Sequence, residues 1–235
     1  MANVHGKDIA VFLGDTDVYQ YLNANSNTVN SELADISAYQ DEDRNYLGGL
    51  ITGQAVLGGH FDNASGAIAD ELENSLKTAT LLSTVYGAAL SDRWWGMRIQ
   101  ASDYSISDPV GDVVVVGYTA QADDGVSRGT ILHPLANVET GADDETSVDQ
   151  TTATSGGCVA FLHVTAFSGT DITILIEDAA SDAGYATLVT FTQATGITSE
   201  RVEIAAAATT PNRWVKTSWS GTFSSCTFVV GMARL

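Results

Sequence analysis

The sequence has few of the residues on which many kinds of function depend. Its 235 residues include only two cysteines and three prolines. Lysine and arginine together number ten, whereas aspartate and glutamate number 29. Two cysteines, Cys158 and Cys226, cannot build a disulfide framework, so we expect buried free thiols. One bridge between them is conceivable if their strands pair, but a sequence does not supply the required Cα separation.

The shortage of positive charge argues against nucleic-acid binding. The formal net charge is −19, whereas affinity for phosphate backbones comes mainly from Lys and Arg. Residues 1–150 hold 23 acidic and six basic side chains, a net −17, and residues 151–235 hold six and four, a net −2. This asymmetry predicts two modules with a strong negative field on the first. The alternative is a soluble acidic surface without further function.

Long apolar runs are missing near the N-terminus. The one run there, Ile9–Leu13, has five residues, too few for a signal-peptide core or a membrane span. We expect this run to form a short buried strand closed by a turn at Gly14-Asp15. We also expect the protein to fold in a cytoplasm.

The sequence contains no motif of an enzyme or a metal site. It has no nucleophile elbow, Walker loop or dinucleotide fingerprint. The acidic clusters 41–43 and 143–145 lack the alternating oxygen ligands of a calcium loop. We therefore predict no enzyme activity, no cofactor and no metal site. The four histidines have no metal-ligand spacing and are interpreted as surface or strand-face residues: His5, His60, His133 and His163.

Two strand patterns and one helix pattern follow each other in the first half. Thr28–Tyr39 is mostly polar, and Ile51–Phe61 contains Gly53 and Gly59, which indicate bulges or close backbone approaches. Ser65 is a candidate N-cap for the helix that follows. That helix is predicted to begin near Gly66, with an apolar stripe formed by Ile68, Leu72 and Leu76.

The remaining patterns predict strands. Val113–Val116 is apolar on both faces, as expected of a strand covered on each side. Asp123-Asp124-Gly125 predicts the turn of a hairpin over Val113–His133. After a polar linker, six short strands indicate a β-sandwich or jelly roll: Cys158–Ala166, Ile172–Glu177, Ala186–Thr192, Arg201–Ala205, Trp214–Trp219 and Phe223–Ala233.

The order of elements from Asp15 to Thr78 resembles the major tail tube proteins of long-tailed, siphovirus-like bacteriophages. The matching features are an Asp-x-x-x-Tyr-Leu-Asn step, a strand, an acidic Asp-Arg-x-Tyr-Leu-x-Gly loop, a strand ending in Gly-x-Phe-Asp, and a helix. They lie at Asp17–Asn23, Thr28–Tyr39, Asp41–Gly49, Ile51–Asp62 and Ala67–Leu76. A late segment, SDPVGDVVVVGYTAQADDGVSRG, also resembles the family, so the likeness covers about residues 8–135.

The resemblance implies a structural virion protein. Family subunits are antiparallel β-sandwiches with a flanking helix, and their homo-hexameric rings close an inner barrel and stack into a tube for DNA ejection. It further implies tape-measure and tail-terminator partners, passage of DNA without specific binding, no membrane insertion, and a place in the virion tail after assembly in the host cytoplasm. The loop residues Asp43, Arg44, Tyr46 and Leu47 become candidate subunit or ring contacts. A clasp within the loop is the alternative.

The second half departs from a minimal tube subunit. We predict a tail tube domain over residues 1–140, a linker over 141–155 and an outer β-sandwich module over 156–235. The alternative function is a glycan-binding or adhesive β-sandwich, with Trp214 or Trp219 as an outer-surface ligand platform. Alternation places these two tryptophans on opposite faces, so at most one belongs to a small core.

Overall fold

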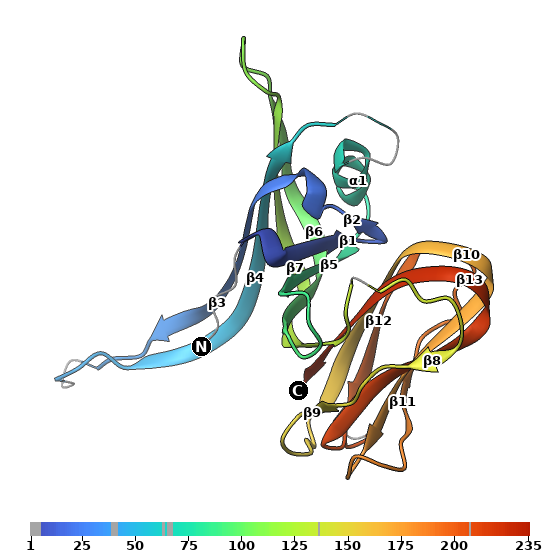
Figure 1. The fold of residues 1–235 in the computed structure, drawn as a ribbon. Coiled ribbons are helices and arrows are strands. Elements are labelled where there is room, and N and C mark those ends of the chain that lie inside the picture. Colours follow the sequence, from blue (N-terminus) through green and yellow to red (C-terminus); the bar gives the residue numbers. More distant parts are fainter. Residues whose placement is uncertain (1–5, 39–41, 63, 65–67, 136, 207) are drawn as a thin grey trace. The chain divides into compact units, whose positions relative to one another are not determined.

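The computed structural model describes residues 6–38, 42–62, 64, 68–135, 137–206 and 208–235 (Figure 1). The chain is mainly β and its strands pair antiparallel, as the sequence predicts. The chain folds into two compact units, each made of discontinuous segments. Unit 1 comprises Met1–Gln20, Leu81–Gly96 and Ser127–Leu235; unit 2 comprises Tyr21–Thr80 and Met97–Val126.

Unit 2 is built around a long hairpin. Strand β3 (Leu22–Asp35) pairs with β4 (Tyr46–His60), from Leu22↔Gly59 to Asp35↔Tyr46. Both strands confirm the predicted pair, and both begin earlier than predicted. The register shifts between Leu22 and Ala24, where a Cβ on Gly59 would lie 2.5 Å from the Tyr21 carbonyl oxygen. The expected close approach at Gly59 is therefore confirmed.

In unit 2, the second half of β4 pairs with β7 (Val115–His133), from Gln54↔Gln121 to His60↔Val115. Strand β6 (Arg93–Ser107) also pairs with β7. One face of the paired region is buried, and its members are Ala55, Leu57, Val116, Tyr118 and Ala120. On the opposite face Val56 is 40% exposed. This sheet therefore has one covered face and one open face.

Helix α1 (Ile68–Ser75) is the one α-helix among the described residues. Ile68 and Leu72 are fully buried, as the stripe predicts, but Leu76 follows the last helical residue and is 38% exposed. Ser75 Oγ lies 2.8 Å from Tyr118 Oη, which ties the helix end to the buried face of β7. The proposed cap Ser65 and first residue Gly66 lie outside the described residues.

Unit 1 contains most of the remaining elements. They are η1 (Gly6–Asp8), β1 (Ile9–Leu13), β2 (Thr16–Asp17), η2 (Tyr19–Tyr21), β5 (Thr80–Tyr86), β8 (Asp143–Asp144), β9 (Val148–Asp149), β10 (Gly157–Ala179), β11 (Ala186–Thr190), β12 (Thr198–Ala205) and β13 (Trp214–Arg234). Strand β1 has the predicted bounds, and Gly14 turns the chain with φ 60°. Strands β10 and β13 pair from Cys158↔Arg234 to Ala179↔Trp214.

The first half of β10 is buried on both faces. Alternate residues of Gly157–Val164 face two apolar clusters. One cluster includes Cys158, Ala160 and Leu162, and the other includes Val159 and Phe161 with Phe12 of β1 and Trp94 of β6. This continuous apolar run is what a strand covered on both sides requires.

Two predictions about the middle of the chain are wrong. Val113 is 55% exposed and precedes β7, so Val113–Val116 is not a two-sided buried strand. Asp123-Asp124-Gly125 does not turn a hairpin either, because β7 runs through it. Gly125 adopts φ 74° there while the strand continues beside β6. Pairing with a neighbouring strand outweighs the local turn preference.

The six short strands expected in the second half are four in the structure, because β10 and β13 each absorb two of them. Shifts of register at Val164/Ala166, Ser168/Gly169 and Gly169/Asp171 carry the strands through the expected turns. Cys158 and Cys226 are buried free thiols, and burial raises the pKa of each to about 11.

The segment predicted as a linker is attached to β13. Strand β8 pairs with Ser218 and Trp219, and β9 pairs with Trp214 and Val215. Farther along, Arg234 donates to the carbonyls of Gln150 and Thr152. The boundaries of the two compact units therefore differ from the predicted boundaries at residues 140 and 156. The division of the chain into a tube domain and an outer module stays a prediction. No described helix has the length and apolar character of a membrane span.

Candidate assembly surface

The outer part of the β3–β4 hairpin, here called the arm, comprises residues 31–38 and 42–52. Its strands pair with each other, whereas the pairing of β4 with β7 begins at Gln54. Figure 1 shows the arm as a two-stranded ribbon extending beyond the sheet of unit 2. Every described residue of the arm is exposed. A two-stranded ribbon without a covering layer is marginally stable in water.

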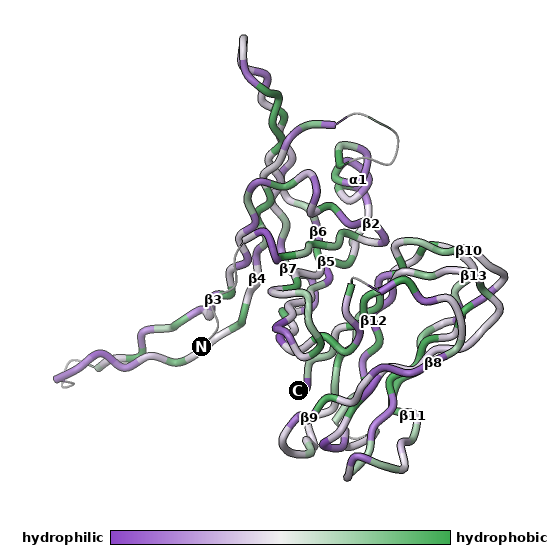
Figure 2. Tube along the Cα trace, viewed as in Figure 1, coloured by the Kyte–Doolittle hydropathy of each residue, from purple (hydrophilic) through white to green (hydrophobic). Residues whose placement is uncertain are grey.

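The arm carries large apolar side chains despite this exposure. They are Leu33, Ile36, Tyr46, Leu47, Leu50 and Ile51, which are 50–73% exposed. Figure 2 shows hydrophobic and hydrophilic residues interspersed along both strands. Successive strand residues point to opposite faces, so Tyr46-Leu47 and Leu50-Ile51 place apolar groups on both faces of the ribbon. Exposed apolar groups gathered in this way mark an interaction surface.

Hydrogen bonds join the two strands of the arm near its end. Ile36 N–H donates to the Asn45 carbonyl at 2.9 Å, and Asn45 N–H donates to Ser37 Oγ at 2.8 Å. The Ser37 side chain and backbone N–H hydrogen-bond the Asp35 carboxylate, which lowers the pKa of that carboxyl. These bonds join the two strands of the arm next to residues 39–41, which lie outside the described residues.

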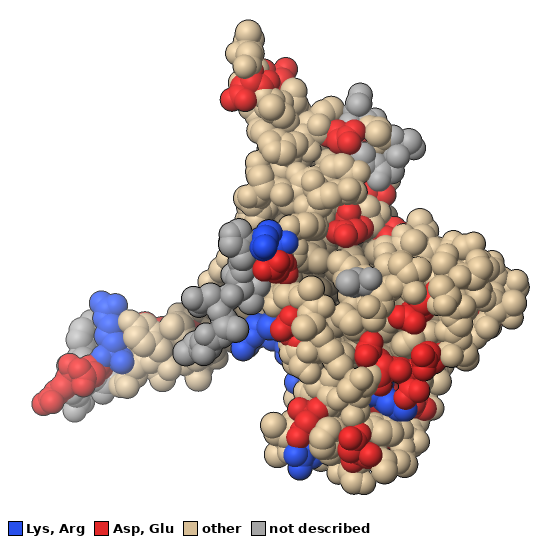
Figure 3. All heavy atoms as spheres, in the orientation of Figure 1, with Lys and Arg blue, Asp and Glu red and all other residues tan. Residues whose placement is uncertain are grey.

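The four predicted contact residues lie together at this end. Asp43, Arg44, Tyr46 and Leu47 are all exposed. Arg44 Nη1 lies 3.5 Å from Tyr46 Oη, a weak contact that resembles the alternative clasp within the loop. Figure 3 shows acidic and basic groups side by side at the end of the arm. Their roles as subunit contacts stay a prediction.

Sequence reasoning missed most of the apolar part of this surface. Leu33, Ile36, Leu50 and Ile51 were not among the predicted contacts, although Leu50 is the most exposed of them at 73%. The sequence did contain an indication of this surface, in Tyr46-Leu47 and Leu50-Ile51. In each pair two apolar residues are adjacent, so they point to opposite faces of the same strand. Such a strand needs cover on both faces.

A second protrusion of unit 2 comprises the end of β6 and the connection from it to β7, residues 103–113, here called the β6–β7 loop. Ile106, Val110 and Val113 are exposed there, and Val110 shows 106% of its reference surface. Asp112 N–H donates to the Pro109 carbonyl and Gly111 adopts φ 91°, which forms a turn at the tip. The loop thus combines apolar and acidic side chains.

No protein-family model and no curated protein matches this sequence. The chain is similar to the SPP1 tail tube at 14% identity and a TM-score of 0.48, over 64% of this chain and 95% of that one. It is similar to a chain of the native gene transfer agent virion at 15% identity and 0.43, over 55% and 100%. The SPP1 Dit (gp 19.1) protein matches at 10% and 0.39, over 97% and 99%.

The predicted glycan platform is only partly available. Trp219 is 5% exposed, belongs to the core and donates its indole N–H to the Gly141 carbonyl at 2.9 Å. Trp219 is therefore not a surface platform. Trp214 is half-buried, and the Arg213 guanidinium lies 5.3 Å from its ring centroid. The expectation that the two rings take opposite faces is confirmed by their burial, and a ligand role for Trp214 stays a prediction.

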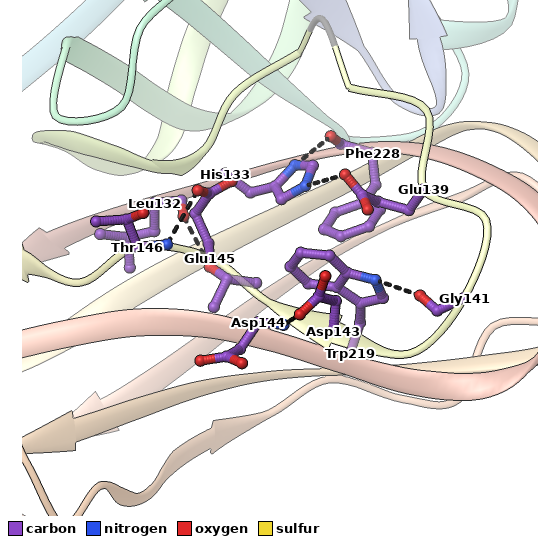
Figure 4. Close-up of polar contacts among 11 residues, drawn as sticks. Leu132, His133, Glu139, Gly141, Asp143, Asp144, Glu145, Thr146, Trp219 and Phe228 are labelled. Atoms are coloured by element: carbon purple, nitrogen blue, oxygen red, sulfur yellow. Dashed lines mark hydrogen bonds and ion pairs between the residues drawn. The ribbon is translucent and has the colours of Figure 1, made fainter.

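Two of the four histidines, which were expected to be surface or strand-face residues, lie in strands and are buried in the core: His133 in β7 and His163 in β10. His133 stacks on Phe228, with ring centroids 4.0 Å apart, and meets the edge of Trp219 (Figure 4). Its Nδ1 lies 3.0 Å from the Phe228 carbonyl and its Nε2 lies 3.3 Å from Glu139 Oε1. Burial lowers the pKa of His133 to about 4, and burial raises the pKa of Glu139. This contact holds the segment after β7 against β13.

The described residues include no group of three or more His, Cys, Asp or Glu side chains arranged to hold a metal ion. His133 and Glu139 instead form one polar pair inside an aromatic cluster. The pair lies against Phe228 and Trp219 and has a structural role in the core. Among the described residues, six of the large exposed apolar side chains lie in the arm.

Proposed function

We propose that this chain is a structural subunit of a phage-type tail tube, whose copies close into homo-hexameric rings that stack around a DNA conduit. The observation that carries the proposal is the arm. It exposes apolar side chains on both faces of a two-stranded ribbon. Association with further copies would cover these faces and remove their apolar surface from water.

The free edge of β3 gives the second argument. Within the described part of the chain, β3 pairs with β4 and with no other strand, so one edge of its 14 residues is open. Long open edges promote uncontrolled pairing unless a protein covers or closes them. Closure of a barrel with neighbouring copies would consume this edge. The open face of β4, marked by Val56, would then line or adjoin that barrel.

The charge of the chain suits a conduit. A net charge of −19 repels DNA. Proteins bind DNA when their Lys and Arg side chains neutralise phosphates and release the counterions of the DNA, and this chain has few such side chains. Figure 3 shows acidic groups spread over the visible face. DNA would therefore pass without specific binding.

Tape-measure and tail-terminator partners, a place in the virion tail and assembly in a host cytoplasm follow from the sequence resemblance, and residues 156–235 would form an outer module.

Negative-stain electron microscopy of the concentrated purified chain tests the proposal. We expect rings or tubes with six-fold symmetry. An Arg44→Glu variant is expected to assemble poorly with an unchanged unfolding temperature, because Arg44 lies in the arm and its side chain is exposed. Monodisperse monomers at all concentrations and salt conditions, also with an added assembly initiator, would refute ring formation.

A further inference from the structure

A pocket of unit 1 concentrates positive charge in an otherwise acidic protein. It has a volume of about 470 Å³ and is lined by Ser91, Arg93, Arg128, Gly129 and Thr130. Two of the ten basic residues of the chain therefore line one cavity. Both arginines are exposed, so a ligand can reach them from solvent.

Neither arginine of the pocket forms an ion pair with another described residue. Other cations of the chain do: Arg98 pairs with Asp123, Arg213 with Asp149 and Lys216 with Asp144. The carboxylate nearest in sequence, that of Asp92, instead accepts the Ala89 N–H at 2.8 Å. The Arg128 guanidinium lies 5.9 Å from the Trp95 ring centroid, which positions it without neutralising it.

The backbone holds the two arginines in place. Ser91 N–H donates to the Ile131 carbonyl at 3.1 Å, and Ile131 N–H donates to the Asp92 carbonyl at 2.9 Å. Ser91 adopts φ 72°, a strained conformation for a residue with a side chain. These bonds fix the start of β6 beside β7. Arg93 and Arg128 consequently face one cavity and repel each other unless an anion lies between them.

The polar groups of the pocket fit a carboxylate. Guanidinium groups donate paired hydrogen bonds that match the two oxygens of a carboxylate. Thr130 Oγ1 accepts from Gln150 Nε2 at 2.9 Å, so its own hydroxyl hydrogen can still donate to a ligand. The floor is fixed because Thr130 pairs with Met232 of β13.

We propose that this pocket binds a carboxylate supplied by the β6–β7 loop of a second copy of this chain. The loop exposes Asp103 and Asp108, and no Lys or Arg occurs between Arg98 and Arg128. The end of the arm fits the pocket less well, because the positive charge of Arg44 lies next to the carboxylate of Asp43 there. Val110, beside Asp108, is fully exposed and supplies an apolar group for the partly buried Trp95 ring. This contact between copies rests on the proposed function, whereas the anion site itself does not.

Citrate, used as the carboxylate probe on the monomeric protein, tests the anion site. Amide NMR shifts of Gly129 and Thr130 are followed during titration. We expect saturable shifts and at least tenfold weaker binding in Arg93→Gln/Arg128→Gln. The matched control Arg98→Gln, outside the pocket, is expected to bind like the wild type. Absence of saturable shifts, or equal affinity in the double variant, would overturn the site, and this result does not depend on ring formation.

Charge reversal tests the second copy as the source. Arg93→Glu/Arg128→Glu is expected to raise the protein concentration needed for ring formation at least tenfold, measured by sedimentation and electron microscopy. Adding Asp103→Lys/Asp108→Lys to the same chain is expected to restore assembly. Wild-type assembly of the pocket variant, or failure of the loop reversal to rescue it, would exclude the loop as occupant. Thermal unfolding of each variant confirms that it is folded.

Discussion

At the scale of single residues, His163 fixes the packing inside unit 1. Its Nδ1 lies 2.6 Å from the Gly14 carbonyl, its Nε2 lies 2.7 Å from Ser83 Oγ, and its ring stacks on Phe12. Since a backbone carbonyl only accepts, Nδ1 carries the hydrogen and Nε2 accepts from Ser83. The neutral ring therefore satisfies both of its nitrogens and joins β10 to β1 and β5.

This arrangement predicts a loss of stability on acidification. Burial lowers the pKa of His163 to about 4, below its ordinary value of 6.5, so the unfolded state binds the proton first. The stabilising contribution is complete above pH 6.5 and is lost as the pH falls toward 4. Between pH 7 and pH 5 the loss amounts to about 2 kcal/mol.

Urea unfolding at pH 7 and pH 5 measures this loss. We expect His163→Gln to be less stable than the wild type at pH 7 and to show a smaller difference between the two pH values. His60→Gln is the control because His60 is exposed. If His163→Gln retained the full pH dependence, titration of His163 would not be its cause.

At the scale of elements, the contact between β7 and β13 depends on a glycine. A Cβ on Gly129 would lie 1.9 Å from the Met232 carbonyl oxygen, and a backbone atom cannot rotate away as a side chain can. We expect Gly129→Ala to lower the free energy of unfolding by about 2 kcal/mol or more.

Gly141→Ala is the matched control for that substitution, because a Cβ there meets nothing within 4 Å. Its free energy of unfolding should change by less than about 0.5 kcal/mol. Chemical denaturation of both variants makes the comparison. Equal stability of the two variants would show that β7 and β13 can separate at this point without cost.

The elements that the sequence predicts well are those fixed by local pattern. The apolar run Ile9–Leu13 is a strand with the predicted bounds, and Ile68 and Leu72 form the buried stripe of α1. Strand lengths are predicted poorly where distant partners decide them. Asp123-Asp124-Gly125 carries a turn signal, yet β7 continues through it beside β6.

The same limit applies to the candidate site. The arm and its end at Asp43–Leu47 follow from the order of elements in the sequence, but the exposure of Leu50 and Ile51 depends on where β7 stops pairing with β4. The burial of His163 is equally non-local, because its partner Gly14 is 149 residues away. Single-sequence patterns do not contain these contacts.

The arm gives a prediction at this scale. Leu50→Ser/Ile51→Ser removes two apolar side chains that are 73% and 63% exposed, so the stability of the subunit should change little. Ring formation should require at least tenfold more protein, because the apolar surface that drives association is reduced. Sedimentation velocity measures the association.

Val138→Ser is the control for this variant, since Val138 is 60% exposed and lies outside the arm. It should assemble like the wild type. If both variants assembled normally, the arm would not be the surface that holds copies together. If both failed, loss of exposed apolar groups in general would be the cause.

At the scale of the whole molecule, negative charge is unevenly divided. Unit 2 holds 14 acidic and three basic residues, a net −11, and unit 1 holds 15 and seven, a net −8. The unit that carries the arm is therefore also the more acidic per residue. Two copies that associate through unit 2 repel each other as they approach, because both carry net negative charge. This repulsion acts at longer range than apolar contact.

Association should consequently strengthen as salt is added. The screening length falls from about 30 Å at 0.01 M to about 10 Å at 0.1 M ionic strength, so repulsion between copies of charge −19 weakens while apolar burial does not. We expect rings to appear at a several-fold lower protein concentration in 0.3 M than in 0.02 M NaCl, measured by light scattering and electron microscopy. KCl should act equally, because screening depends on ionic strength. Weaker association at high salt would mean that ion pairs such as those proposed for Arg93 and Arg128 outweigh both the net repulsion and the apolar contacts of the arm.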